Sequence, residues 1–127
     1  PHVDTFPGDD QNENPLNDAA FNINLTKSDK VKTAFYSFND KKSICDFTAK
    51  DYNDLNVITD KHHSMTPKKW KELDDVYENY KLEYVADIEY NSMILYPSHY
   101  WHNAYIKEDW FTDKDRITFT GFFELIK

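Results

Sequence analysis

Alternation of apolar and polar residues is the clearest pattern along this chain, and it predicts several short β-strands. Between residues 21 and 25 every second residue is apolar and the residues between are asparagines, which predicts a strand with one apolar face. Residues 31–38 are rich in β-branched and aromatic side chains and predict a second strand. The polar stretch 27–30 is the expected turn between them, so the two strands are predicted to form a hairpin.

The second half of the chain continues in the same way. Three strand-like runs cover residues 83–89, 92–97 and 100–106, and a last strand is expected over 116–124. Tyr90-Asn91 is the expected turn between the first two of these runs. Many short strands with few helical segments indicate an all-β sandwich or barrel.

One segment has a helical pattern. Thr66 is the expected N-cap, Pro67 occupies the first helical position, and apolar side chains follow at helical spacing as far as Tyr80. Residues 39–66 are mixed in character, with one short strand expected around 57–59. We therefore expect an all-β fold with one or two helices.

Composition narrows the functional classes. The net charge is −8 with no basic stripe, which argues against nucleic-acid binding through phosphate contacts. The single cysteine, Cys45, excludes an internal disulfide and a cysteine-rich zinc site. No apolar run has the length of a membrane span, so we expect no membrane partner. Only two glycines occur, so turns must use Asn, Asp and Pro.

Three fragments carry candidate chemistry, and two of them supply metal ligands. His2 and Asp4 are two residues apart, so on an extended strand they point to the same face. A second histidine from a distant strand would complete two imidazoles and one carboxylate on one side of a metal. That set leaves positions open on the metal, as in non-heme Fe(II) oxygenases. The pair alone is a weak signal, because such pairs are more often structural or exposed.

The strand that follows the break at Pro97-Ser98 carries His102, which is a candidate for the distant histidine. An ordinary strand histidine is the alternative interpretation of this residue. His99 competes for the same role, but it lies three residues from His102 and faces the other way on a regular strand. The adjacent pair His62-His63 is expected on the surface.

The third fragment places Arg116, Thr118 and Thr120 on one strand face and Ile117 and Phe119 on the other. An arginine here could hold the far carboxylate of an organic cosubstrate through a two-pronged hydrogen bond. The alternative is an outward polar face on an edge strand.

Taken together, the fragments resemble a known family. They are Pro-His-x-Asp at the start, Leu-Tyr-Pro-Ser-x-x-x-His at 95–102 and Asp-Arg-Ile-Thr-Phe-Thr at 115–120. In this order they resemble 2-oxoglutarate/Fe(II)-dependent oxygenases of the prolyl-hydroxylase-like group. The chain is most similar to small uncharacterised bacterial and tailed-phage members of that group. The resemblance implies a double-stranded β-helix, which is a cupin-like jelly roll of two facing sheets.

The resemblance also implies site residues and an activity. His2, Asp4 and His102 would bind Fe(II), Arg116 would pair with the distal carboxylate of 2-oxoglutarate, and Thr118 would add a hydrogen bond. The implied reaction is hydroxylation of a small molecule or a protein side chain by a dioxygenase. Tyrosines 36, 96 and 100 and Trp101 are candidate pocket walls, with core packing as the alternative for each.

Family members usually carry helices and an early strand before the His-x-Asp strand, and these are missing here. We therefore expect residues 1–127 to be a single jelly-roll domain, the C-terminal part of a longer chain. Its expected location is cytoplasmic, or virion-associated if a phage encodes it. The alternative function is a non-catalytic jelly-roll binding or structural module, for example in a virus particle. A cupin-like isomerase is a third option, but a carboxylate clamp at Arg116 has no evident use there.

Overall fold

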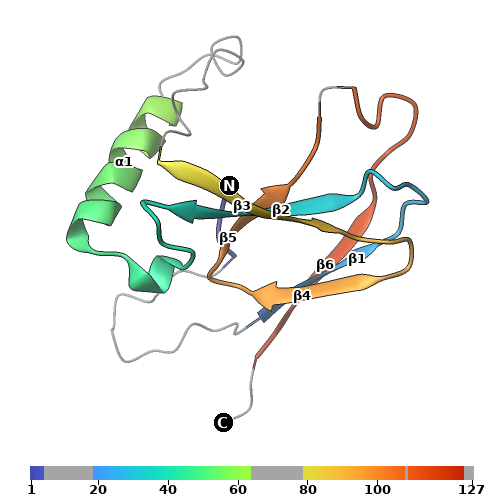
Figure 1. Cartoon of the computed structure of the whole chain (residues 1–127), viewed down its shortest axis with the longest axis horizontal. Helices are drawn as coiled ribbons and strands as arrows, with labels where there is room; N and C mark the ends of the chain where they lie inside the picture. Colours follow the sequence, from blue (N-terminus) through green and yellow to red (C-terminus); the bar gives the residue numbers. More distant parts are fainter. Residues whose placement is uncertain (5–18, 64–78, 108, 125–127) are drawn as a thin grey trace.

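The computed structural model describes residues 1–4, 19–63, 79–107 and 109–124 (Figure 1). These residues form two antiparallel sheets of three strands each, one α-helix and one short 3-10 helix. The prediction of a mainly β fold with a helix is confirmed. The elements are β1 (Ala19–Asn24), β2 (Lys32–Phe38), η1 (Ile44–Asp46), α1 (Ala49–His63), β3 (Tyr80–Asp87), β4 (Met93–Pro97), β5 (Trp101–Ala104) and β6 (Thr118–Phe123).

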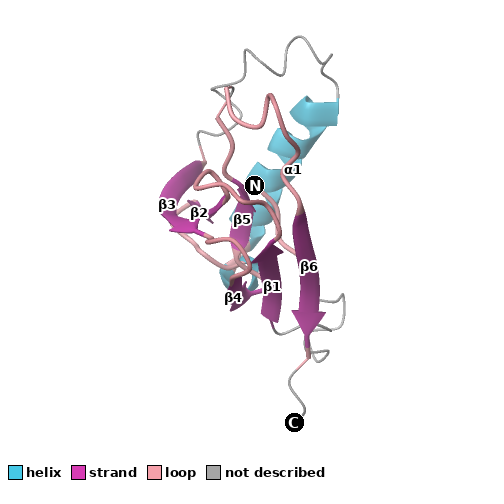
Figure 2. Cartoon of the chain, turned by 90° about the vertical axis from the view of Figure 1, so that its right-hand side faces the viewer, coloured by secondary structure: helices cyan, strands magenta, loops and turns pink. Residues whose placement is uncertain are grey.

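The strand order is β4-β1-β6 in one sheet and β3-β2-β5 in the other. Among the six described strands, the connection from β2 to β3 is the only one between successive strands that stays within a sheet. Figure 2 shows the two sheets as separate layers. The N-terminal segment adds to the second sheet, because His2 and His102 exchange two backbone hydrogen bonds of 2.9 Å each. No helix in the described part of the chain is long and apolar enough to cross a membrane.

The predicted hairpin between the first two strands is wrong. β1 pairs with β4 and β6, whereas β2 pairs with β3 and β5, so the two strands lie in different sheets. Both edges of β1 are therefore used by strands that come much later in the chain. Local turn residues could not reveal these long-range pairings.

The short strand expected around residues 57–59 is also wrong, because these residues lie within α1. Most of the helix expected after Thr66 lies outside the described residues, but Tyr80, its expected last member, begins β3. The pair His62-His63 forms the C-terminal end of α1. The helix was missed because its polar and apolar residues are poorly segregated.

Turns without glycine are confirmed. Asn39, Asp40 and Asn91 all have positive φ, between 47° and 64°. Asn and Asp tolerate this left-handed conformation better than other non-glycine residues. The turn predicted at Tyr90-Asn91 does join β3 to β4.

The alternation in β1 is confirmed, but its asparagine face is the buried one. Asn22 and Asn24 are buried, while Phe21 and Ile23 point to the outer face of the sheet. On that face the ring of Phe21 lies over Gly121, where a Cβ atom would come within 2.3 Å of the ring. The outer face is apolar and largely exposed, and it carries Phe21, Ile23, Met93, Leu95, Phe119 and Phe123.

A second apolar cluster lies against the β3-β2-β5 sheet and packs against Leu55 of α1. Its buried members are Val3, Phe38, Ile44 and Trp101. We call these four residues the helix-side core. Because Val3 lies between His2 and Asp4, and Trp101 precedes His102, this core contains the immediate neighbours of all three candidate ligands.

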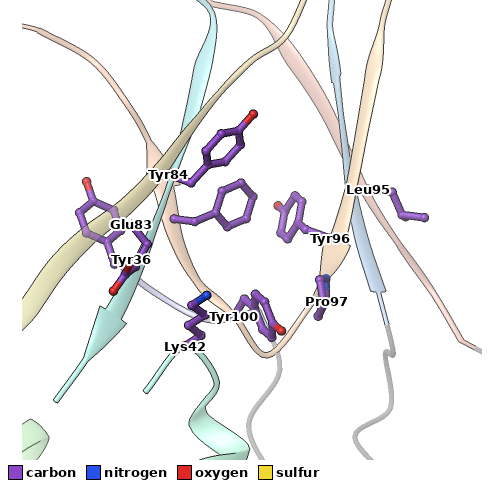
Figure 3. Close-up of a pocket in the computed structure, with 9 residues that line it drawn as sticks. Tyr36, Lys42, Glu83, Tyr84, Leu95, Tyr96, Pro97 and Tyr100 are labelled. Atoms are coloured by element: carbon purple, nitrogen blue, oxygen red, sulfur yellow. The ribbon is translucent and has the colours of Figure 1, made fainter. Parts of the chain in front are cut away.

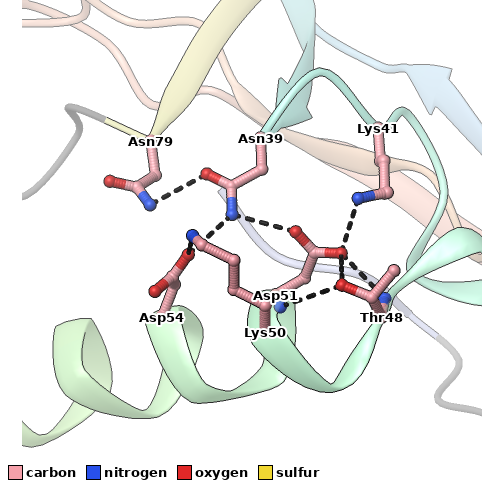
Figure 4. A network of polar contacts seen from close by, with 7 residues as sticks. All are labelled: Asn39, Lys41, Thr48, Lys50, Asp51, Asp54 and Asn79. Carbon is pink, nitrogen blue, oxygen red and sulfur yellow. Dashed lines mark hydrogen bonds and ion pairs between the residues drawn. The ribbon is translucent and has the colours of Figure 1, made fainter.

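A polar network fixes the start of α1 beside this core (Figure 4). Thr48 and Asp51 form a capping box, in which the backbone N–H of Thr48 donates to the Asp51 carboxylate at 2.7 Å. The Asp51 carboxylate also accepts from Lys41 Nζ at 2.6 Å and from Asn39 Nδ2 at 2.9 Å. These donors hold the pKa of Asp51 well below its usual range, with Lys41 as the largest cause.

We predict that Asp51→Asn lowers the melting temperature at pH 7 and that the deficit shrinks as the pH falls below about 4. A carboxyl group with a lowered folded-state pKa stabilises the protein above its unfolded pKa, which is about 3.9. That stabilisation is lost on acidification. Thermal unfolding of both proteins from pH 7 to pH 3 measures the difference. The control is Asp29→Asn in an exposed turn, and a deficit for Asp51→Asn that does not depend on pH would contradict the prediction.

Candidate metal centre

The orientation of the candidate ligands follows from strand alternation. Val3 is buried in the helix-side core, so His2 and Asp4 on either side of it point to the opposite face. Trp101 is buried in the same core, and His102 next to it points away from that core. Backbone hydrogen bonds fix the register, because Asp4 N–H donates to the carbonyl of Ser98 at 2.9 Å. All three side chains therefore face the space between the sheets.

The three side chains form one compact cluster. His2 Nε2 lies 3.6 Å from Asp4 Oδ1, and His102 Nε2 lies 3.3 Å from Asp4 Oδ2. One ligand atom from each residue lies within 4.8 Å of the other two. Ligands 2.0–2.2 Å from an ion and at right angles to each other are about 3 Å apart. The cluster is thus close to the spacing that one metal ion requires.

Hydrogen bonding fixes the tautomer of His102. Its Nδ1 lies 2.9 Å from the carbonyl oxygen of Tyr100, and a carbonyl can only accept, so Nδ1 carries a proton. In the neutral imidazole, Nε2 then presents a lone pair towards the Asp4 carboxylate. A cation between these two electron-rich atoms would relieve their repulsion. Histidines that bind a metal commonly donate their other ring N–H to a carbonyl, as His102 Nδ1 does to Tyr100, and this bond fixes the orientation of the ring.

Two pKa shifts act on the cluster. Burial, followed by the neighbouring His102, lowers the pKa of His2, although Asp4 acts in the opposite direction. Neutral imidazole, the form that binds metals, is therefore favoured at His2. Burial raises the pKa of Tyr96 to about 12, with Asp4 as a second cause. The Tyr96 hydroxyl stays protonated and lies 3.3 Å from His102 Nε2, to which it can donate.

Arg116 faces the same space from the other sheet, just before β6. The hydroxyl of Thr26 accepts from the Ile117 N–H at 2.7 Å and donates to the Ile117 carbonyl at 3.1 Å. These bonds anchor the backbone beside Arg116. Burial lowers the pKa of Arg116, but a guanidinium stays charged at neutral pH. Its buried Nε and Nη2 atoms have no hydrogen-bond partner within the described ranges.

The candidate ligands and Arg116 line one cavity of about 190 Å³. Thr118 and Thr120 line it as well, and Ile117 and Phe119 are exposed on the opposite face. The alternation predicted for this strand is confirmed, and its polar face points inward. The structure thus brings together all the residues that the sequence singled out for ligands and cosubstrate.

The cavity also contains polar residues that the sequence analysis missed, namely Asn22, Thr33 and Asn103. Their side-chain oxygens are buried without hydrogen-bond partners in the described structure. The one available signal was that asparagine occupies the whole second face of the predicted strand at residues 21–25, which includes Asn22. A buried polar atom without a partner costs about 1–3 kcal/mol, so these atoms also point to a polar occupant.

Other candidates lie elsewhere. His99 is not part of the three-residue cluster, and its backbone carbonyl accepts from the Ile44 N–H. Trp101 belongs to the helix-side core rather than to a pocket wall. Tyr36 and Tyr100 line a second pocket, and Tyr96 lines both. The side chains of His62 and His63 lie outside the described part.

The donor set fits a divalent ion with open positions. It combines two imidazoles with a carboxylate whose Oδ2 is buried without a hydrogen-bond partner in the described chain. Comparison with known proteins adds no identification, because no family model, curated protein or solved structure matches this chain. The case for the site rests on its geometry.

We predict that Co(II), used as a spectroscopic probe, binds this cluster with a visible d–d absorption band. His102→Ala and Asp4→Ala should weaken binding by more than the 10–100-fold typical for loss of an outer hydrogen-bond partner. The matched control is His99→Ala, which removes a nearby imidazole and should leave the titration unchanged. Equal weakening by His99→Ala and His102→Ala would show that the ion binds elsewhere.

Proposed function

We propose that this protein is a 2-oxoglutarate- and Fe(II)-dependent dioxygenase that hydroxylates a small molecule or a protein side chain. The observation that supports this best is the pairing of two features in one cavity. A cluster of two histidines and one aspartate lies at one part of the cavity wall. The Arg116 guanidinium lies at another part, and its Nε and Nη2 atoms have no hydrogen-bond partner among the described residues. The first suits a metal with open positions, and the second suits an organic anion.

In this proposal each residue has a defined role. His2, Asp4 and His102 hold Fe(II) on one side, and the Tyr100 carbonyl keeps the His102 ring in the orientation that presents Nε2. Arg116 binds the distal carboxylate of 2-oxoglutarate, and the hydroxyl of Thr118 adds a hydrogen bond. When bound, iron and cosubstrate supply the oxidising chemistry, and the protein supplies the orientation of both.

The described topology supports the jelly-roll part of the proposal. Two antiparallel sheets face each other, and the chain crosses between them at most connections. Jelly rolls are double-sheet folds in which the chain alternates between sheets in this way. The site lies between the sheets, with ligands from one layer and Arg116 beside a strand of the other.

A second function is favoured by one observation, the outer apolar face of the β4-β1-β6 sheet. Met93, Leu95 and Phe119 are each more than half exposed there. Exposed apolar surface of this extent commonly marks an interaction site. A non-catalytic jelly-roll module within a larger assembly would use such a face and need no turnover. Iron-dependent conversion of 2-oxoglutarate to succinate separates the two functions, because only the dioxygenase produces succinate.

We predict that Arg116→Ala weakens 2-oxoglutarate binding and spares the metal. Removing one partner of a buried charge pair costs about 2–5 kcal/mol. Anaerobic titration with Fe(II) and then 2-oxoglutarate measures both events, because the chelated cosubstrate gives a metal-to-ligand absorption band.

The matched control for this experiment is Lys114→Ala, which removes a nearby exposed cation and should leave both titrations unchanged. Equal loss of metal and cosubstrate binding in Arg116→Ala would show that Arg116 is structural. No band in the folded wild-type protein would contradict the dioxygenase proposal itself.

A further inference from the structure

A second pocket lies where the edge strands β3 and β4 of the two sheets face each other (Figure 3). Its volume is about 300 Å³, at the lower end of the range for small-molecule sites. Most of its wall is aromatic, from Phe35, Tyr36, Tyr84, Tyr96 and Tyr100. Lys42 and Glu83 are the charged side chains in the wall.

The pocket is separated from the metal cavity by aromatic rings. The rings of Phe35 and Tyr96 meet edge to face, with centroids 5.3 Å apart. Their centroids lie 6.3 Å and 4.7 Å from that of His102. The two sites are therefore neighbours that share the Tyr96 side chain, and each has its own charged groups.

The aromatic wall favours a flat apolar group. Figure 3 shows Tyr84 and Tyr96 on opposite sides of the pocket, with Tyr100 below. The Tyr84 side chain is available for such a contact, because the residue is 64% exposed. Aromatic pairs gain about 0.5–1.5 kcal/mol beyond the burial of their area, so a ligand ring would be held well here.

The charges in the wall favour an anion. The Glu83 carboxylate already accepts from Ser37 Oγ at 2.7 Å and lies 3.6 Å from Lys81 Nζ. The hydrogen bond from Ser37 is the main cause of the lowered pKa of Glu83, Lys81 is the next, and the charge of Lys42 is a smaller one. Lys42 itself makes no direct ion pair with any described residue. The carboxylate in the wall is thus compensated mainly by Ser37 and Lys81, whereas the Lys42 ammonium has no direct ion-pair partner in the described structure.

We propose that this pocket binds a small arylalkyl carboxylate, with its ring among Phe35, Tyr84 and Tyr96 and its carboxylate on Lys42. This site is additional to the metal centre and does not depend on the dioxygenase proposal. A molecule with one aromatic ring and a short acidic arm matches both the aromatic wall and the Lys42 ammonium, which makes no direct ion pair with a described residue.

The test is a titration of the metal-free protein with phenylacetate, followed by NMR shifts of backbone amides. Two comparison probes carry the same kind of ring as the phenylacetate anion but a different charge: phenethylamine is a cation and benzyl alcohol is neutral. We expect phenylacetate to bind with shifts centred on β3 and β4, and phenethylamine to bind about tenfold more weakly. Equal or tighter binding of phenethylamine, or no phenylacetate shifts at millimolar concentration, would overturn the proposal.

Variants locate the bound carboxylate. Lys42→Met should weaken phenylacetate binding about tenfold and leave benzyl alcohol unchanged, whereas the control Lys30→Met should change neither. Tyr84→Ala should weaken both probes, and the control Tyr90→Ala on the adjoining turn should not. Arg116→Ala should leave phenylacetate binding intact. Loss of binding in Arg116→Ala with retention in Lys42→Met would place the ligand in the metal cavity and overturn the proposal.

Discussion

The candidate metal centre depends on the burial of two residues that do not belong to it. Val3 and Trp101 pack in the helix-side core, between the β3-β2-β5 sheet and the region of α1. Because neighbouring residues on a strand point to opposite faces, this burial turns the flanking histidines and Asp4 into the space between the sheets. If that packing were lost, the three candidate ligand side chains would no longer be held pointing into the same cavity. The polar network around Asp51 acts on the same core from outside, by fixing the helix that covers it.

The cavity that holds the candidate ligands is lined mainly by polar residues, whereas the space between the sheets of a sandwich is normally apolar. Buried asparagine, threonine and arginine atoms there lack hydrogen-bond partners in the described chain. Each such atom costs about 1–3 kcal/mol, which is large against a total stability of about 5–15 kcal/mol. Strain and unpaired polar groups of this kind cluster at functional sites. A metal and an organic anion would satisfy the groups that the protein leaves unpaired.

Short-range patterns predicted the strands and the direction of the candidate residues. Alternation predicted that Arg116 and Ile117 point to opposite faces of their strand, and the structure agrees. The two-residue spacing of His2 and Asp4 predicted that both point to one face, and the structure agrees with this as well. The same patterns could not predict the partners of each strand. The β1 pairings with β4 and β6 join residues about 70 to 100 positions apart, so the expected local hairpin was wrong.

The sequence also could not predict which polar strand residues are buried. The pattern predicted that β1 has one apolar face but not which face is buried, and the structure buries Asn22 and Asn24. Asn103 and Thr33 were missed for the same reason, since a polar strand residue normally faces solvent. The helix α1 was missed because its apolar residues form no continuous stripe, so packing and capping rather than periodicity define it.

Anomalous diffraction from crystals soaked with Mn(II) and 2-oxoglutarate tests the central claim most directly. We expect one manganese peak about 2.0–2.2 Å from an imidazole nitrogen of His2, an imidazole nitrogen of His102 and a carboxylate oxygen of Asp4. The distal carboxylate of 2-oxoglutarate should accept hydrogen bonds from the Arg116 guanidinium. A manganese peak away from these residues, or an empty cluster in crystals where the cavity is open to the soak, would contradict the assignment of this site.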